Sequence, residues 1–196
     1  MKNLTVPHIK QSEESSCGAA ALAMIYQYFG KGDQNERVIW ERLKVHRPNT
    51  DNQYYLETPS MAQDASKQEL SHFLAQAALD SPELALQPIR EFVSLSIPVV
   101  VCQRISESNT LGHFRVITNI DEKDITFNDP MDDRGGTVLG IDKFMCLWSP
   151  ANNGEVIGGE FLAIFQKELI AKESKFTVLT FSSPVKFYTA TSLEFH

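Results

Sequence analysis

Hydrophobic residues follow two different spacings along this chain of 196 residues. The first half carries apolar residues at helical spacing, whereas the second half carries short apolar or alternating runs that are typical of strands. Helices are predicted at residues 17–29, 35–45, 61–78, 88–96 and 141–148, and a polar loop at 46–58. Strands are predicted at residues 4–9, 97–102, 114–120, 125–128, 137–139, 161–165, 176–181 and 185–191. Helices followed by strands indicate an α+β fold with an antiparallel sheet.

The most apolar of these helices begins at Cys17 and ends at Gly30, which suits a left-handed cap. It is apolar on nearly every face and is therefore predicted to be buried. Cys17 falls in the first turn, where unpaired backbone N–H groups and a partial positive charge favour the nucleophilic thiolate. The alternative is a buried structural cysteine, because free cysteine is among the most buried residue types.

Composition narrows the classes of function. The chain is 42% hydrophobic and 22% charged, as expected of a globular protein. Its net charge of −7 without a basic run argues against nucleic acid as a partner. No apolar stretch reaches the length of a membrane span, and the N-terminal residues lack a signal-peptide core. We expect a cytoplasmic protein, with signal-independent export left open.

The three cysteines form neither a disulfide framework nor a C-x-x-C pattern, so we expect no metal and no cofactor. Cys102 and Cys146 stand in apolar runs and are predicted to be core residues. Cys17 remains as the candidate nucleophile.

His113 and Asp129 are the candidate partners of Cys17. His113 precedes one predicted strand and Asp129 follows the next, so both fall at the open end of a hairpin that turns at residues 121–124. Regular pairing would place them on opposite faces, because side chains alternate along a strand. An odd-numbered loop or a β-bulge would bring them to one face, and bulges are common beside active sites.

Together these residues make a catalytic triad. His113 would take the thiol proton, and Asp129 would fix the orientation of the imidazole. Gln11 lies six residues before Cys17, and its amide together with the Cys17 backbone N–H would stabilise the oxyanion.

The chain resembles the papain-like cysteine peptidases of the bacteriocin-processing, double-glycine leader-peptidase family. The resemblance covers roughly residues 5 to 167 and rests on separated motifs in the family's order: Gln11, Cys17-Gly18-Ala19-Ala20, Gly112-His113-Phe114, Asn128-Asp129-Pro130, Gly135-Gly136 and Phe144 to Trp148. It implies that Gln11 is the oxyanion residue, Cys17 the nucleophile, His113 the general base and Asp129 its orienter. Transporter-linked members often carry an acidic residue before the nucleophile. Here that residue is Ser16, which fits a stand-alone member.

We therefore expect a papain-like fold in which a central nucleophile helix packs on an antiparallel sheet. Residues 1–168 would form the peptidase domain and residues 169–196 a β-like extension. The expected reaction is hydrolysis of a peptide or isopeptide bond in a peptide or protein substrate. An acyl or peptidyl transferase, and a peptide-binding module without catalysis, are the alternatives.

Overall fold

The structure is a computed structural model that describes residues 3–48, 53–152, 154–172 and 185–189. Its helices are α1 (Cys17–Phe29), α2 (Glu36–Leu43), α3 (Thr58–Lys67), α4 (Pro82–Ser94), α5 (Ile141–Trp148) and α6 (Lys167–Lys172). Its strands are β1 (Val45–His46), β2 (Tyr54–Tyr55), β3 (Ser71–Ala77), β4 (Val99–Arg104), β5 (Gly112–Ile120), β6 (Asp124–Asn128), β7 (Thr137–Gly140), β8 (Glu160–Phe165) and β9 (Val185–Thr189).

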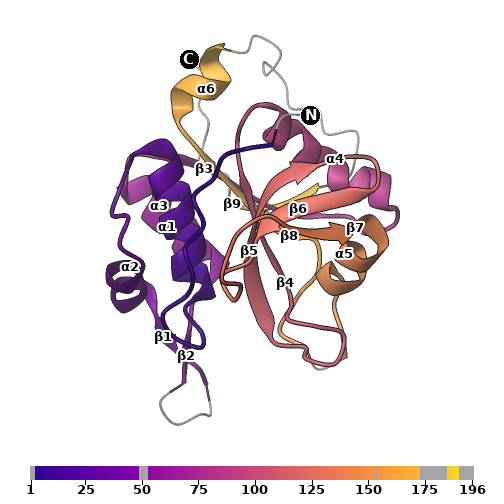
Figure 1. Ribbon diagram of the computed structural model, residues 1–196, viewed down its shortest axis with the longest axis horizontal. Helices are drawn as coiled ribbons and strands as arrows, with labels where there is room; N and C mark the ends of the chain where they lie inside the picture. Colours follow the sequence, from indigo (N-terminus) through magenta and orange to yellow (C-terminus); the bar gives the residue numbers. More distant parts are fainter. Residues whose placement is uncertain (1–2, 49–52, 153, 173–184, 190–196) are drawn as a thin grey trace.

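One antiparallel sheet dominates the architecture. Among the described residues it contains seven strands in the order β7-β6-β5-β4-β8-β3-β9, while β1 and β2 pair separately. Figure 1 shows α1, α2 and α3 grouped on one side of the molecule, with α4 and α5 beyond the sheet. The predicted α+β fold is confirmed.

Helix α1, which begins at Cys17, is buried as predicted. Residues 17–26 are all buried, and Gly30 ends the helix in the left-handed conformation at φ 60°. Gly18 lets the helix approach the sheet closely, because a Cβ at this position would lie 3.0 Å from Leu56 Cβ and 3.1 Å from Phe114 Cδ2. The small residues of this helix therefore bring Cys17 against β5.

A buried ionic network joins α1, α2 and α3. The Tyr26 hydroxyl donates to Asp64 Oδ2 at 2.8 Å, and Arg42 donates to both Asp64 oxygens at 2.9 Å. Burial of the Tyr26 phenol, together with its bond to the Asp64 carboxylate, raises the Tyr26 pKa above its ordinary value. The network fixes the nucleophile helix relative to its neighbours.

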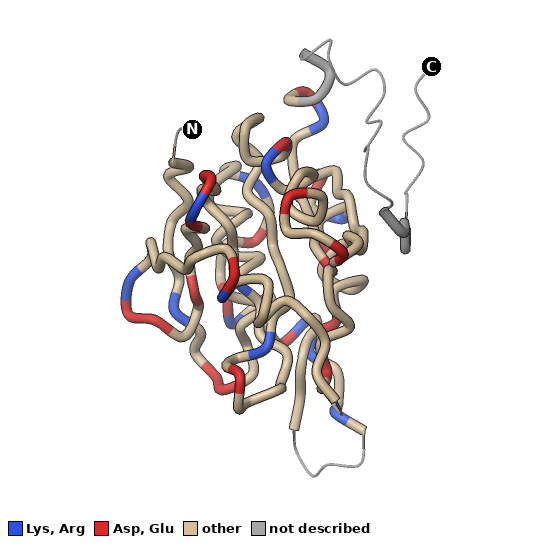
Figure 2. Tube along the Cα trace, turned by 90° about the vertical axis from the view of Figure 1, so that its right-hand side faces the viewer, with Lys and Arg blue, Asp and Glu red and all other residues tan. Residues whose placement is uncertain are grey.

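Two faces of the sheet carry different layers. Phe114 on β5 faces α1. On the opposite face Phe92 of α4 packs against Phe161 and Phe165 of β8, with ring centroids 6.4 and 6.3 Å apart. Acidic and basic residues are interspersed along the described trace (Figure 2). In the part of the chain that the structure describes, no helix is both long and apolar enough to cross a membrane.

Two predicted elements are wrong. The helix predicted at 61–78 ends at Lys67, and Ser71–Ala77 forms strand β3. Glu69 breaks the helix at φ 61°, and pairing with β8 overrides the helical propensity of the following residues. The strand predicted at 4–9 is irregular. It makes isolated hydrogen bonds to the sheet, such as the one from the Leu4 N–H to the Thr118 carbonyl. A regular ladder is not possible at Pro7, because proline has no N–H to donate.

Most other boundaries differ from the predictions by a few residues. Helix α4 begins earlier than predicted, at Pro82, because Ser81 caps it by accepting from Leu84 N–H. The predicted loop at 46–58 contains parts of β1 and β2. Strand β9 falls within the predicted 185–191, whereas the strand predicted at 176–181 lies outside the described residues. The division at residue 168 stays a prediction.

Candidate active site

Cys17 lies at the N-terminus of α1, as the sequence predicts. No side chain caps this terminus and no acidic residue lies in the first turn. The Ser16 hydroxyl bonds instead with the backbone of Glu13, accepting from N–H at 3.0 Å and donating to the carbonyl at 3.2 Å. The positive end of the helix dipole at Cys17 is therefore not neutralised by a side chain.

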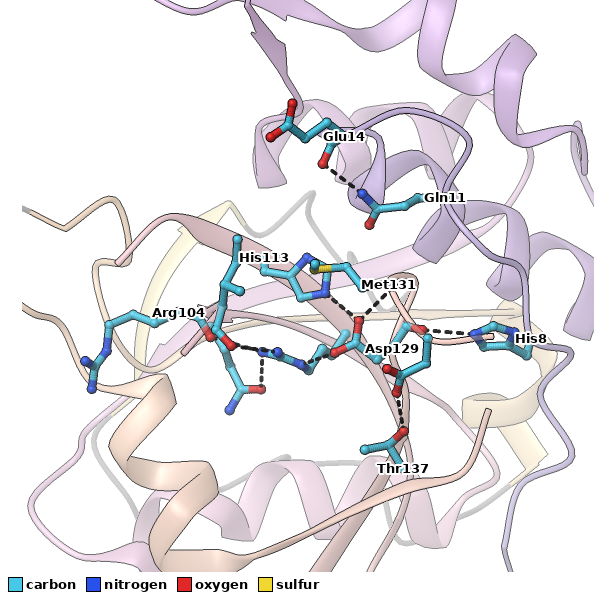
Figure 3. Close-up of polar contacts among 12 residues, drawn as sticks. His8, Gln11, Glu14, Arg104, His113, Asp129, Met131 and Thr137 are labelled. Carbon is cyan, nitrogen blue, oxygen red and sulfur yellow. Dashed lines mark hydrogen bonds and ion pairs between the residues drawn. The ribbon is translucent and has the colours of Figure 1, made fainter. Parts of the chain in front are cut away.

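His113 and Asp129 meet at the end of the β5–β6 hairpin (Figure 3). The His113 Nε2–H donates to Asp129 Oδ1 at 2.6 Å. A β-bulge makes this contact: Ile117 pairs with Phe127, but Asn119 pairs with Thr126, so Thr118 is an extra residue in β5. The register beyond the bulge aligns Asp129 with Arg115, which shares a strand face with His113. The bulge that the sequence left as one of two options is present.

The charge state of His113 follows from its neighbours. Burial alone would lower the pKa of this imidazole, but hydrogen bonds to Asp129 and to Cys17 outweigh it and raise the pKa to about 9. His113 is therefore protonated at neutral pH and lies between a carboxylate and a cysteine.

Arg115 is a site residue that the sequence analysis missed. Its Nε donates to Asp129 Oδ2 at 2.7 Å, and its Nη1 donates to Gln103 Oε1 at 3.3 Å and to the Arg104 carbonyl at 3.2 Å. The side chain is only 7% exposed. A charged residue two positions after His113 on the same strand face was the available signal, since such a residue faces the same partners.

Two further hydrogen bonds fix the position of Asp129. Its Oδ1 accepts from Met131 N–H at 2.9 Å, and its backbone carbonyl accepts from His8 Nε2 at 2.9 Å. Burial would raise the Asp129 pKa, but His113, Arg115 and the Met131 N–H together hold it well below its ordinary value. Asp129 is thus a fixed, ionised partner for His113.

Gln11 precedes α1 in the chain. In this conformation its side-chain amide is not free to donate to an oxyanion. Its Nε2 donates to the carbonyls of Glu13 and Glu14 at 2.9 and 2.8 Å, while Oε1 is buried and has no hydrogen-bond partner within the described residues. Both amide hydrogens are therefore in use. The side chain would have to turn before it donated to a substrate, and the oxyanion role stays a prediction.

A cleft of about 760 Å³ opens beside these residues. Cys17 and His113 line it together with Leu56, Phe114 and Glu160. Its walls come from α1, α3, β4, β5 and β8 and from loop residues that include Arg47, Pro48, Glu155 and Ile157. The cleft is large enough for several residues of an extended peptide.

Of the two cysteines predicted to be core residues, Cys102 packs against the core and Cys146 does not. Cys146 is exposed and so is not a core residue, because it lies on the outer face of the amphipathic helix α5. Cys102 is partly buried and lines the cleft. Burial and then the nearby negative charges of Glu160 and Cys17 raise the Cys102 pKa far above its ordinary value. In the residues described, no cluster of side chains is suited to hold a metal ion.

Comparisons with known proteins identify the family and the fold. A family model described as the Peptidase_C39 like family matches residues 3–153. The comparison with curated proteins found no match. Among solved structures, the chain is similar to a double glycine motif protease from an AMS/PCAT transporter in complex with the leader peptide, with 20% identity, coverage of 83% of this chain and 93% of that chain, and a TM-score of 0.56.

Two further structures share the fold. A putative C39-like peptidase from Bacillus anthracis is 16% identical, with coverage of 84% of this chain and 98% of that chain and a TM-score of 0.63. The peptidase domain of Streptococcus ComA, a bifunctional ABC transporter involved in a quorum sensing pathway, is 16% identical, with coverage of 82% and 98% and a TM-score of 0.58.

The fold and the family match together identify this protein as a papain-like cysteine peptidase, which is a hydrolase. Within that class, the chain belongs to the Peptidase_C39-like family.

Proposed function

We propose that Cys17, His113 and Asp129 are the catalytic triad that hydrolyses a peptide or isopeptide bond. The observation that carries this proposal is the position of the His113 ring, which hydrogen-bonds to Asp129 at 2.6 Å and interacts with Cys17 through the same imidazole. A nucleophile, a base and an orienting group in contact are the geometric signature of nucleophilic catalysis.

In the acylation step the Cys17 thiolate attacks the carbonyl carbon of the scissile bond. The C–S bond forms as the carbonyl oxygen takes up the negative charge. When the intermediate collapses, the C–N bond breaks and the His113 imidazolium gives its proton to the leaving amine. Asp129 keeps the ring directed at the reacting atoms throughout this step.

Deacylation reverses these roles. Neutral His113 takes a proton from a water molecule, whose oxygen attacks the thioester carbon. The C–S bond then breaks, the acid product leaves, and the proton held by His113 restores the imidazolium beside the thiolate. Each step uses only the substrate, water and residues of this chain.

Stabilisation of the oxyanion is assigned to the start of α1 and to Gln11. The uncapped helix N-terminus supplies backbone N–H groups at Cys17. Gln11 would contribute its amide after releasing the carbonyl of Glu13 or Glu14. Substrate binding would then drive a local rearrangement of residues 11–14.

A peptide is the substrate class that the cleft favours. Its volume of about 760 Å³ extends well beyond Cys17 and His113. The double glycine motif protease with a similar fold was solved in complex with the leader peptide. A peptide lying along the same groove would place a carbonyl at Cys17.

Active-site labelling combined with peptide hydrolysis tests the proposal. The wild-type protein should react with a thiol-directed peptide probe at Cys17 and cleave members of a peptide library. Cys17→Ala should abolish both while the protein remains folded. Asp129→Asn should lower kcat strongly, because the amide permits the wrong imidazole tautomer.

Two results would overturn this assignment. One is cleavage of the library by the Cys17→Ala variant at the wild-type rate. The other is a folded wild-type protein that binds a peptide as tightly as Cys17→Ala does but reacts with no probe, which would indicate a binding module.

A further inference from the structure

Glu160 is an acidic side chain within the cleft that the triad does not use. It lies at the start of β8, lines the same cleft as Cys17, and is half-buried. The Thr58 hydroxyl of α3 donates to Glu160 Oε1. Among the described residues, no second side chain or backbone group donates to this carboxylate, so Oε2 can accept from a substrate.

Strand pairing places Glu160 in line with the catalytic strand. Cys102 on β4 pairs with Phe114 on β5, directly after His113. On the other side of β4, Val101 pairs with Phe161, so the next pair along these antiparallel strands is Cys102 with Glu160. Phe114, Cys102 and Glu160 therefore form one cross-strand row on the face that packs against α1.

The dimensions of this row suit one substrate side chain. Neighbouring strands are about 4.8 Å apart, so Glu160 lies about 10 Å from Phe114 across the sheet. Phe114 also packs against the residue that follows the nucleophile, since a Cβ on Gly18 would lie 3.1 Å from its ring. A long side chain that enters beside Cys17 would pass over Phe114 and reach toward Glu160.

The chemistry along the row changes from apolar to anionic. Leu56 and Phe114 line the cleft next to Gly18, and Cys102 adds a thiol that stays neutral because its pKa is raised. The carboxylate of Glu160 stands at the far end of the row. A side chain with an aliphatic stem and a cationic head would match this change from apolar to anionic surface. Lysine and arginine have such side chains.

Other side chains fit less well. A purely apolar side chain would cover the carboxylate without giving it a partner, and an acidic side chain would be repelled. Burial raises the Glu160 pKa even though the Thr58 hydroxyl donates to the carboxylate. A guanidinium or ammonium group would stabilise the charged form further through a charge-assisted hydrogen bond.

We propose that Phe114, Cys102 and Glu160 form a subsite that binds a lysine or arginine side chain of the substrate near the scissile bond. This inference rests on the proposed peptidase function and names the substrate class: peptides with a basic residue in that position. Glu160 acts as the specificity residue and has no part in bond cleavage.

Paired probes provide the test. Peptidyl acyloxymethyl ketones are prepared with arginine or its neutral isostere citrulline at each position in turn, and the second-order rate of Cys17 labelling is measured. At one position the arginine probe should react about tenfold to a hundredfold faster with the wild type, the range expected for a hydrogen bond to a charged group. In Glu160→Gln this ratio should fall to about one, while the rate for the citrulline probe is retained.

Glu57→Gln is the matched control, because it removes an equal charge from an exposed position in the same cleft. It should keep most of the preference for arginine. The glutamine in Glu160→Gln still accepts from Thr58, and an unchanged melting temperature verifies that the fold is intact. A ratio near one at every position in the wild type, or an unchanged ratio in Glu160→Gln, overturns the subsite.

Binding to the Cys17→Ala variant separates this inference from the proposed function. Calorimetry with arginine and citrulline peptides measures the subsite without chemistry. If wild-type Cys17 reacts with no probe but Cys17→Ala prefers the arginine peptide, and the double variant with Glu160→Gln does not, the subsite stands and the peptidase proposal fails. Equal affinity for both peptides overturns the subsite even where catalysis is observed.

Discussion

Arg115 donates its Nε–H to Asp129 Oδ2 at 2.7 Å, and Asp129 uses its other oxygen to accept from His113. The carboxylate is thereby fixed between two cations in a site where both side chains are less than one-tenth exposed. Arg115 does not line the cleft beside Cys17. In the proposed triad, Arg115 is therefore a positioning residue that acts through Asp129.

Replacing Arg115 should affect both stability and catalysis. Arg115→Gln removes one partner of a buried ion pair, so the free energy of unfolding should fall by about 3 kcal/mol. The remaining folded protein should show kcat reduced about tenfold with KM little changed, because Asp129 is less well fixed. Denaturant unfolding and steady-state kinetics measure the two effects.

Arg115→Lys is the conservative control for this change. It retains the charge but not the fork of donors, so a partial recovery of kcat would support positioning through geometry. Wild-type kcat in Arg115→Gln at temperatures where that variant is fully folded would contradict the positioning role.

Stability should depend on pH through His113. Its pKa is raised in the folded chain from 6.5 to about 9, so the folded state binds the proton more tightly than the unfolded state. The resulting stabilisation is complete below pH 6.5 and is lost as the pH rises through about 9. Its size is on the order of 3 kcal/mol.

Unfolding free energies of wild type and His113→Gln, measured across this range, check that expectation. The difference between the two proteins should shrink as the pH increases from 6.5 to 9. A difference that grows over the same range would show that His113 is not held as a cation by Asp129 and Cys17.

The three cysteines should differ in their reaction with iodoacetamide. Cys17 should be alkylated first at neutral pH, because the helix N-terminus and protonated His113 favour its thiolate. Cys146 is exposed and should react next as the pH rises. Cys102 should react last, because burial and nearby negative charge raise its pKa.

Mass spectrometry of the digested protein gives the three rates separately. The His113→Gln variant serves as the control, since Cys17 should lose its advantage over Cys146 there. A Cys17 that reacts no faster than Cys146 in the wild type at neutral pH would favour a structural role for Cys17.

The Gln11→Ala variant tests whether Gln11 donates to the oxyanion or only stabilises the segment before α1. If its amide turns to the substrate, Gln11→Ala should lower kcat about 100-fold, as expected for one oxyanion donor. If its bonds to the Glu13 and Glu14 carbonyls are its only role, the melting temperature should fall while kcat is unchanged. Measuring both quantities for this variant decides between the roles.

The sequence alone determined the local features of the site. The apolar composition of residues 17–29 made α1 a buried helix and placed Cys17 at its start. Turn residues at 121–124 defined the hairpin that brings His113 and Asp129 to one end. Both conclusions depend on the pattern of residues within a short segment. That pattern can be read without knowing where the segment lies in the fold.

Tertiary structure decided what depends on pairing between distant segments. The bulge at Thr118 set the strand face of Asp129, and a shift of one residue would have reversed it. Segment 71–77 has a composition that also suits a helix, and its place between β8 and β9 made it a strand. The contact of Arg115 with Asp129 and the alignment of Glu160 with Cys102 likewise depend on register, which individual strands do not specify until their neighbours are in place.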